Sequence, residues 1–350
     1  MKASPPPRTD ALRATRYILI AIALLGLAII TWRLSEVLAL TFGGIVGAAM
    51  LRGLALPLAR RSGLSVKWSL SLVTIALLGL VGVLFWLFGK QVADQAKEME
   101  KLIPQAVQQL TDNLNQSAAG QAAVKKTKEA LADSKAFSGV GLAAGSAVFA
   151  VADVLLVFFL SVYFAFDPHE YLDGCLRLLP LNQRRHVKQA LVAAGEALRR
   201  WLLAQLIAMV IIGVLVGAVL SMMRIPLAFL LGALAGLLEF IPVVGAVLFT
   251  IPGVLIAFTQ GPSAAFYVLL AYIGVQQLES NIIIPLLQRW AVRLPPALTL
   301  ISVVVGGILL GVPGLVFASP LAVVVMTLVK QLYVEETLEH EKPARAASAV

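Results

Sequence analysis

A carboxylate, a proline and a glycine interrupt one long apolar region of this chain, in the stretch Glu239–Gly245. Proline breaks the hydrogen-bond ladder of a helix. Backbone groups released in this way find no water inside a bilayer, so such a break persists only where protein buries it or where it borders a wet cavity. An acidic side chain at that depth marks a functional site. The stretch therefore predicts a path for a solute through a membrane.

The composition agrees with a membrane protein. Hydrophobic residues make up 59% of the chain, charged residues 13%, and the mean hydropathy is +0.90. Soluble domains are about one quarter charged. The 350 residues have room for about eight spans of roughly 20 residues each. We expect an all-α polytopic membrane protein with about six full spans plus two broken or re-entrant helical hairpins, or else eight spans, and a small soluble helical insert.

Several functional classes are excluded by what the sequence contains. The net charge of +9 does not indicate nucleic-acid binding, because the basic residues flank apolar runs, which is how membrane topology is encoded. The single cysteine, Cys175, allows no internal disulfide and no cysteine metal cluster, and the three histidines are scattered. No hydrolase motif and no ATP-binding loop is present. We therefore expect no enzyme, no cofactor and no metal site.

The polar and apolar segments divide the chain. Basic residues precede the apolar run Tyr17–Ile30, and no small-residue cleavage pattern follows it, so we expect an uncleaved first span. We expect a disordered cytoplasmic tail at 1–16, membrane spans one to three within 17–89, an extracytoplasmic amphipathic helical insert at 90–136, span four at 139–166, a cytoplasmic helical linker at 167–200, a membrane transport core with broken helices at 201–330 and a cytoplasmic tail at 331–350.

An apolar stripe runs along the expected insert. Val92, Ala96, Met99 and Ile103 recur at alternating four- and three-residue steps, which is the period of an amphipathic helix. Pro104 must start a new helix or kink the existing one. The stripe needs an apolar partner, either in the same chain or in a neighbouring copy, so we predict a homo-oligomer.

Two apolar stretches are too long for one simple span. Pro226–Thr259 is broken near Pro242, and Pro296–Lys330 is broken at Gly311–Gly314. Each stretch is either one tilted, broken span or a hairpin that enters and leaves on the same side. We favour hairpins, which would dip in from opposite faces as in transporters with inverted repeats. Both alternatives place the C-terminus in the cytoplasm, where we also expect the N-terminus.

Glu239 is the strongest candidate for a functional residue. In a hairpin it would lie near the tip, at mid-membrane, with Pro242 and Gly245 forming the break beside it. A carboxyl group there could bind and release a proton as the site opens. Alternatively, Glu239 pairs with a buried arginine or caps the next helix, whose N-terminus favours an anion.

A polar run deep in a later apolar crossing is the second candidate. Its members on the expected solute or ion path are Gln276, Gln277, Glu279, Asn281 and, at the end of the run, Pro285. At helical spacing, Gln276 and Glu279 share one face with Ser280. The alternative is that these side chains only form hydrogen bonds between helices, as polar residues in membrane proteins also do.

Three more residues are candidates for the same path. Asp153 is isolated near the middle of span four, where an ion pair with Arg52 is the alternative. Pro313 and Gly314 belong to the second break, and Ser319 is placed to line a cavity with them. Alternatively, the glycines serve close packing, because small residues four apart let helices approach each other. The pairs Gly213/Gly217 and Gly232/Gly236 favour packing for most glycines.

Several of these blocks occur together in one known family. The blocks are Glu239–Gly245 followed by Ile251-Pro252, Gln277–Asn281 four residues before Pro285, Leu294-Pro295-Pro296, and Gly311–Gly314 followed by Pro320-Leu321. In their order and spacing the chain resembles the autoinducer-2 exporter family of bacterial membrane proteins, also called PerM-like permeases. The resemblance is tightest from about residue 201 to 330. Where the family has a small turn with Gly and Lys, this chain has a bulky Trp290 between Arg289 and Arg293, which puts the family's loop and solute in doubt here.

The resemblance implies a secondary transporter, with a furanone-type signal as cargo in some members and cations exchanged for protons in others. We expect a transporter of the bacterial cytoplasmic membrane that exports a small polar metabolite or signal, autoinducer-2-like, coupled to a proton or sodium gradient. A monovalent cation/proton antiporter is the alternative, and a non-transporting membrane scaffold is the alternative of another class. The expected partners are membrane lipids, a small polar solute, a proton or sodium ion, and further copies of the chain.

Overall fold

The computed structural model describes residues 34–115 and 143–333, and every regular element in these two ranges is a helix. The helices are α2 (Ser35–Ser62), α3 (Val66–Asn115), α5 (Ala143–Phe166), α6 (Pro168–Arg177), α7 (Leu181–Met222), α8 (Ala228–Leu238), α9 (Val244–Phe258), α10 (Pro262–Leu278), a π-helical turn (Glu279–Ile283), α11 (Ile284–Leu287) and α12 (Pro296–Val329). Prolines in the first turn start α6, α10 and α12, where the missing N–H is not needed.

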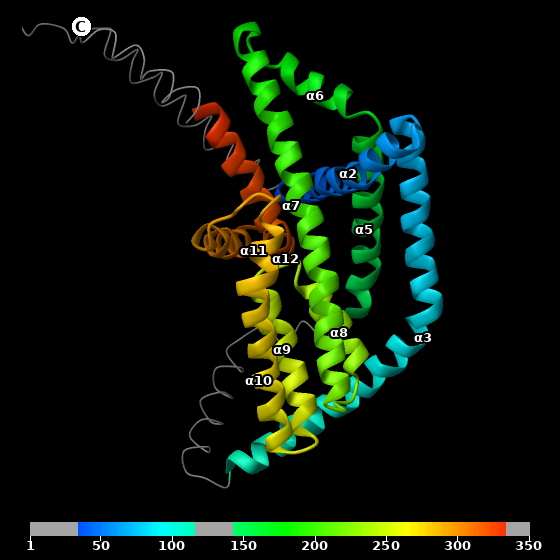
Figure 1. The fold of residues 1–350 in the computed structure, drawn as a ribbon, viewed down its shortest axis with the longest axis vertical. Coiled ribbons are helices and arrows are strands. Elements are labelled where there is room, and N and C mark those ends of the chain that lie inside the picture. The colour runs from blue at the N-terminus through cyan, green and yellow to red at the C-terminus, as the bar shows by residue number, and fades with distance from the viewer. Residues whose placement is uncertain (1–33, 116–142, 334–350) are drawn as a thin grey trace, which may run out of the picture.

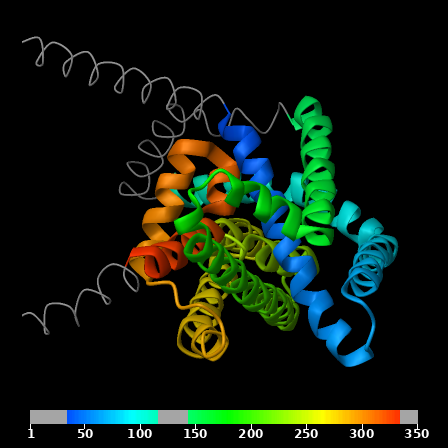
Figure 2. The same cartoon turned by 90° about the horizontal axis from the view of Figure 1, so that it is seen from above.

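The helices are long and apolar enough to confirm the expected all-α polytopic membrane protein. Five helices of the described ranges could cross a membrane, or six if the bent pair α5 and α6 counts as one span. The expected first span and the expected tails lie outside the described residues, as do residues 116–136 of the expected insert. Figure 1 shows α7 running along the long axis, with α8, α9 and α10 beside its lower half. Figure 2 shows α12 and the upper part of α3 on opposite sides of the bundle.

The first long apolar stretch folds as a hairpin. Its arms are α8 and α9, of 11 and 15 residues, each shorter than the roughly 20 residues that cross a bilayer. At the open end of the hairpin, Gln260 Nε2 donates a hydrogen bond of 2.9 Å to the carbonyl oxygen of Arg224. The chain therefore returns to the level at which it entered, and its tip at residues 239–243 lies at mid-height of the bundle (Figure 1).

The second long apolar stretch, α12, is also a hairpin. Gly311 interrupts it with φ 63° and ψ −137°, a backbone conformation that favours glycine. A methyl group placed on Gly306 would lie 2.5 Å from the carbonyl oxygen of Gly314 and 3.3 Å from the Cβ of Ala318. In a straight helix, residues 306 and 318 would be about 18 Å apart. Although α12 is long enough to be a span, its two halves therefore fold back against each other.

The amphipathic segment after the third span continues the same helix. α3 runs from Val66 through Pro104 to Asn115, so Pro104 does not start a new helix. Figure 1 shows α3 descending along one side and then passing beneath α8, α9 and α10. There Val92, Met99 and Leu102 pack against the buried core of α7 to α10, and Gln95 Oε1 accepts a hydrogen bond of 3.0 Å from the backbone N–H of Leu230. The apolar stripe thus has a partner within its own chain.

Glycines bring α7 and α8 into backbone contact. A methyl group on Gly232 would lie 2.7 Å from the Cα of Gly217 and 2.8 Å from the carbonyl oxygen of Gly213. Helices in lipid gain no hydrophobic force toward each other, so close packing of this kind stabilises their contact. These four-spaced glycines of α7 and α8 serve packing, as the sequence favoured.

We predict that Gly232→Ala destabilises the protein by about 1 to 3 kcal/mol, because the new methyl group meets backbone that cannot move aside. The matched control is Gly274→Ala on α10, where a methyl group has nothing within 4 Å and alanine favours the helix. Unfolding in mixed micelles, followed by circular dichroism, measures both. Equal stability of Gly232→Ala and the parent protein would contradict the contact.

Candidate functional site

The tip of the first hairpin borders a small cavity of about 240 Å³. Parts of five segments line it: α7, the turn between α8 and α9, the stretch from the π-helical turn to the start of α12, the first arm of α12 and the second arm of α12. The polar or charged lining residues are Gln205, Glu239, Glu279, Gln288, Thr299 and Ser319, together with Trp201. The cavity is therefore the place where both hairpins meet α7 and the end of α10.

Glu239 is positioned by the end of α8. Its backbone N–H donates to the carbonyl oxygen of Ala235 at 3.0 Å, and its carbonyl oxygen accepts a hydrogen bond of 2.7 Å from Gln205 Nε2. The residue is only 5% exposed. Beside it, the rings of Trp201 and Phe240 pack edge to face at 6.2 Å. Two contacts from α7 thus hold the tip of the hairpin.

The turn after Glu239 is strained. Val243 has φ 69° and ψ −55°, and the N–H of Val244 donates to the carbonyl oxygen of Pro242 at 2.8 Å, which together form a γ-turn. A positive φ is unfavourable for a β-branched side chain, and such strain persists only where surrounding contacts impose it. Gly245 follows because any side chain there would collide with the backbone of Leu238.

Glu279 reaches the same cavity from the end of α10. It begins the π-helical turn Glu279–Ile283, an irregularity that is frequent at functional sites. Gln276 Nε2 donates a hydrogen bond of 3.1 Å to Glu279 Oε2, as the shared helical face predicted. Glu279 is 5% exposed.

The two carboxyl groups, 40 positions apart in the sequence, line the same cavity and are close enough to interact with each other. None of the described residues that line the cavity has a basic side chain. Two negative charges this close and this buried repel each other strongly, so a shared proton is the arrangement of low energy. The alternative is a bound cation. Glu239 Oε2 has no hydrogen-bond partner among the described residues, which leaves one acceptor for such a ligand.

The other predicted path residues lie away from this cavity. Gly245 serves the turn, and Pro285 belongs to α11 but does not line the cavity. Gln277 and Asn281 are exposed and bond to each other, Asn281 Nδ2 to Gln277 Oε1 at 3.0 Å. Asp153 is half-buried on α5, and Arg52, its suggested ion-pair partner, donates instead to the carbonyl oxygen of Ala165.

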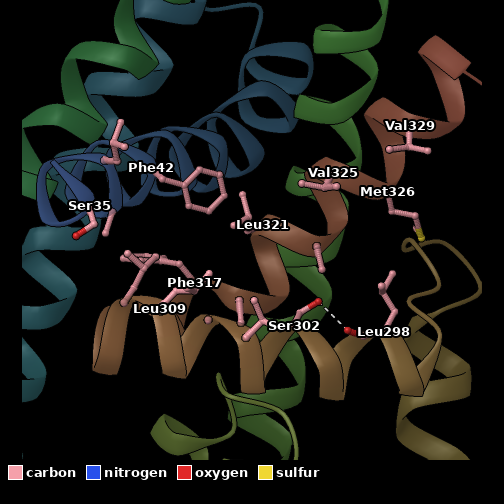
Figure 3. A pocket seen from close by; sticks show the side chains of 18 residues that line it. Ser35, Phe42, Leu298, Ser302, Leu309, Phe317, Leu321, Val325, Met326 and Val329 are labelled. Atoms are coloured by element: carbon pink, nitrogen blue, oxygen red, sulfur yellow. Dashed lines mark hydrogen bonds between the residues drawn. The ribbon is translucent and has the colours of Figure 1, made fainter. Parts of the chain in front are cut away.

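The second break lines a different hollow. Gly314 belongs to an apolar groove of about 1090 Å³ between α2 and the two arms of α12, whereas Pro313 is exposed. Figure 3 shows Phe42, Leu309, Phe317 and Leu321 around this groove, with the Ser302 hydroxyl bonded to the carbonyl oxygen of Leu298. The groove is larger than the carboxyl cavity, and its described lining is mainly apolar and contains no charged side chain.

One contributor was not selected from the sequence, and another was assigned to a different hollow. Gln205 is a polar residue inside the apolar part of α7, four residues after Trp201, and that isolation was an available signal. Ser319 was grouped with Gly314, but it lines the carboxyl cavity instead. Within residues 34–115 and 143–333, no three His, Cys, Asp or Glu side chains come close enough together to hold a metal ion.

One family model and several known proteins are similar to this chain. The family model described as "AI-2E family transporter" matches residues 18–334. The candidate transport protein MT0215 of Mycobacterium tuberculosis (strain CDC 1551 / Oshkosh) is 29% identical over 203 residues, 58% of this chain and 55% of that protein. In Bacillus subtilis (strain 168), the candidate transport proteins YrrI and YueF are each 27% identical, over 41% and 51% of this chain and 40% and 50% of their own lengths. The chain thus spans about half the length of the curated relatives that it matches.

We predict that Gln205→Leu loosens the hairpin tip, because the carbonyl oxygen of Glu239 loses its donor in a part-buried position. The expected loss of stability is about 1 kcal/mol, the scale of hydrogen bonds between membrane helices. Hydrogen exchange of the backbone amides at residues 239–245 should accelerate. Gln260→Leu is the matched control, since its bond to Arg224 is exposed at the other end of the same hairpin. Equal effects of both substitutions would contradict a special role for Gln205.

Proposed function

This chain belongs to the AI-2E family of transporters, and from that membership and the geometry we propose that it is a secondary transporter of the bacterial cytoplasmic membrane. Its cargo is a small polar metabolite or signal, autoinducer-2-like, which it exports at the expense of a proton or sodium gradient. The observation that carries the proposal is the buried Glu239–Glu279 pair at the tip of a broken hairpin. Both termini lie in the cytoplasm in this proposal.

The pair couples ion movement to the shape of the cavity. With one shared proton the pair has reduced charge and tolerates a closed, dry cavity. Loss of that proton leaves charge that has to be solvated, so water or a cation must enter and the walls must separate. The strained turn at Val243 and the Gln205 contact lie directly beside the pair. They form the element whose movement opens or closes the cavity.

A monovalent cation/proton antiporter is the second candidate. The observation that favours it is the set of polar groups in the cavity. Two carboxyl groups, amide groups and hydroxyl groups line it, and none of the described lining residues is basic. Oxygen ligands of this kind suit a small, hard cation. In such an antiporter, the cation and the proton would compete for the same pair.

The scaffold alternative has less support. Its sequence basis was the apolar stripe after span three, and in the described part of α3 that stripe packs against the chain's own core. The stripe therefore does not require a partner protein. A homo-oligomer remains part of the proposal on other grounds, because several large apolar side chains face outward, as lipid-facing or subunit-facing residues do.

We predict that Glu239→Gln and Glu279→Gln each reduce gradient-driven flux at least about tenfold and flatten its pH dependence, because an amide cannot exchange a proton. Flux is measured in proteoliposomes with an imposed pH or sodium gradient. Transport of solutes from a panel of small polar compounds indicates export. A change in the signal of a pH-sensitive dye after addition of Na⁺ or Li⁺ indicates cation exchange. Glu196→Gln is the control, since Glu196 is exposed and pairs with Arg200 on the polar half of α7.

Two results would contradict this proposal. One is flux like that of the unmodified protein, with unchanged pH dependence, in both glutamine variants. The other is an equal loss of flux in Glu196→Gln, which would show that any carboxyl substitution impairs the protein.

A further inference from the structure

The Ser319 hydroxyl forms no hydrogen bond with the described residues, as is also true of Ser69 and Thr74 on α3, but of these three Ser319 is the one that lines the carboxyl cavity. Serine and threonine in a membrane helix usually bond to the carbonyl oxygen one turn earlier. Ser161, Ser302 and Thr327 do so, with oxygen–oxygen distances of 2.6, 2.7 and 2.8 Å. The Ser319 hydroxyl is 1% exposed and has no hydrogen-bond partner among the described residues. A buried hydroxyl without a partner is unfavourable, so this group has a hydrogen-bonding capacity that the described residues do not use.

The hydroxyl belongs to the cavity of the carboxyl pair. Ser319 lies on the second arm of α12 and lines the cavity together with Glu239 and Glu279. Glu239 Oε2 is the second buried atom there without a partner among the described residues. One donor and one acceptor thus remain available in a cavity of about 240 Å³, which has room for several water molecules or one small solute.

We propose that Ser319 is a third polar member of this site and links the second hairpin to the protonation of the Glu239–Glu279 pair. Its hydroxyl donates a hydrogen bond, through a bridging water molecule or the bound solute, to the pair when the pair has lost its proton. A donor of this kind stabilises the carboxylate over the protonated form. Ser319 is a positioning residue, and the inference rests on the proposed function, in which the pair binds and releases the coupling proton.

Among the described residues, no other charged group lines the cavity. The α7 lining contributes Trp201, Gln205 and alanines, and the stretch after Glu279 contributes Gln288 and apolar residues. The nearby arginines of that stretch, Arg289 and Arg293, do not line the cavity. Among the described residues that line the cavity with Ser319, the acidic groups are those of Glu239 and Glu279.

The test uses dicyclohexylcarbodiimide, which modifies protonated carboxyl groups in apolar surroundings, on the full chain in lipid vesicles. Mass spectrometry measures the modification of Glu239 and Glu279 across a pH series. In Ser319→Ala, the Glu239–Glu279 pair should keep its proton to higher pH, because the carboxylate form loses a hydrogen-bond donor. The midpoint of labelling should therefore shift upward by about one pH unit. Ser319→Thr keeps a hydroxyl and should restore the original midpoint. Ser302→Ala is the matched control, because that hydroxyl is on the other arm and is satisfied by Leu298.

The outcomes separate this inference from the proposed function. A pH-dependent labelling that is the same in Ser319→Ala as in the unmodified chain overturns the role of Ser319 and leaves the carboxyl pair in place. An equal shift in Ser302→Ala, or no recovery in Ser319→Thr, also overturns it. Absence of pH-dependent labelling at both glutamates in the unmodified chain overturns the proposed function and this inference with it.

Discussion

A turn of backbone deep inside an apolar bundle is stable only if protein groups replace the hydrogen bonds that water would make. At the tip of the first hairpin, Gln205 supplies one of these bonds and the γ-turn at Val243 supplies another. The arms α8 and α9 then need to cross only part of the bundle, and α3 packs beneath them. The position of the tip decides where the carboxyl cavity forms.

The carboxyl pair follows from that geometry. Glu239 lies at the point where α8 ends, and Glu279 lies where α10 changes to a π-helical turn. Both residues are therefore at the end of a regular α-helix, and both line the same cavity. Neither glutamate is matched by a basic side chain in the cavity lining. A structure that only needed stability would not place two acids together in such surroundings, because apolar residues would fill the same volume at lower energy. These surroundings are the basis of our proposal that the pair binds a proton or a cation.

Individual site residues were easier to predict than their combination. Glu239 and Glu279 are recognisable because each is an acid in an apolar run, and Gln276 is recognisable because three positions separate it from Glu279 on a helix. Ser319 and Gly314 were assigned to one cavity, but five residues correspond to about 140° around a helix, so the two face different hollows. Gln277 and Asn281 were assigned to the path because they are polar, yet they face away from the cavity.

The sequence by itself determined that this chain is an all-helical membrane protein with two interrupted apolar stretches, the first of them beside an acid, and with a second acid in a separate apolar crossing. Composition and apolar run length suffice for that, because the bilayer requires hydrocarbon-compatible side chains and satisfied backbone wherever the chain crosses it. Only the tertiary structure decided that both interrupted stretches fold back on themselves, that Glu239 meets Glu279, and that Ser319 joins them. Glu239, Glu279 and Ser319 follow one another at intervals of 40 positions in the sequence, so their convergence depends on how α7, α10 and the two hairpins pack rather than on any local pattern.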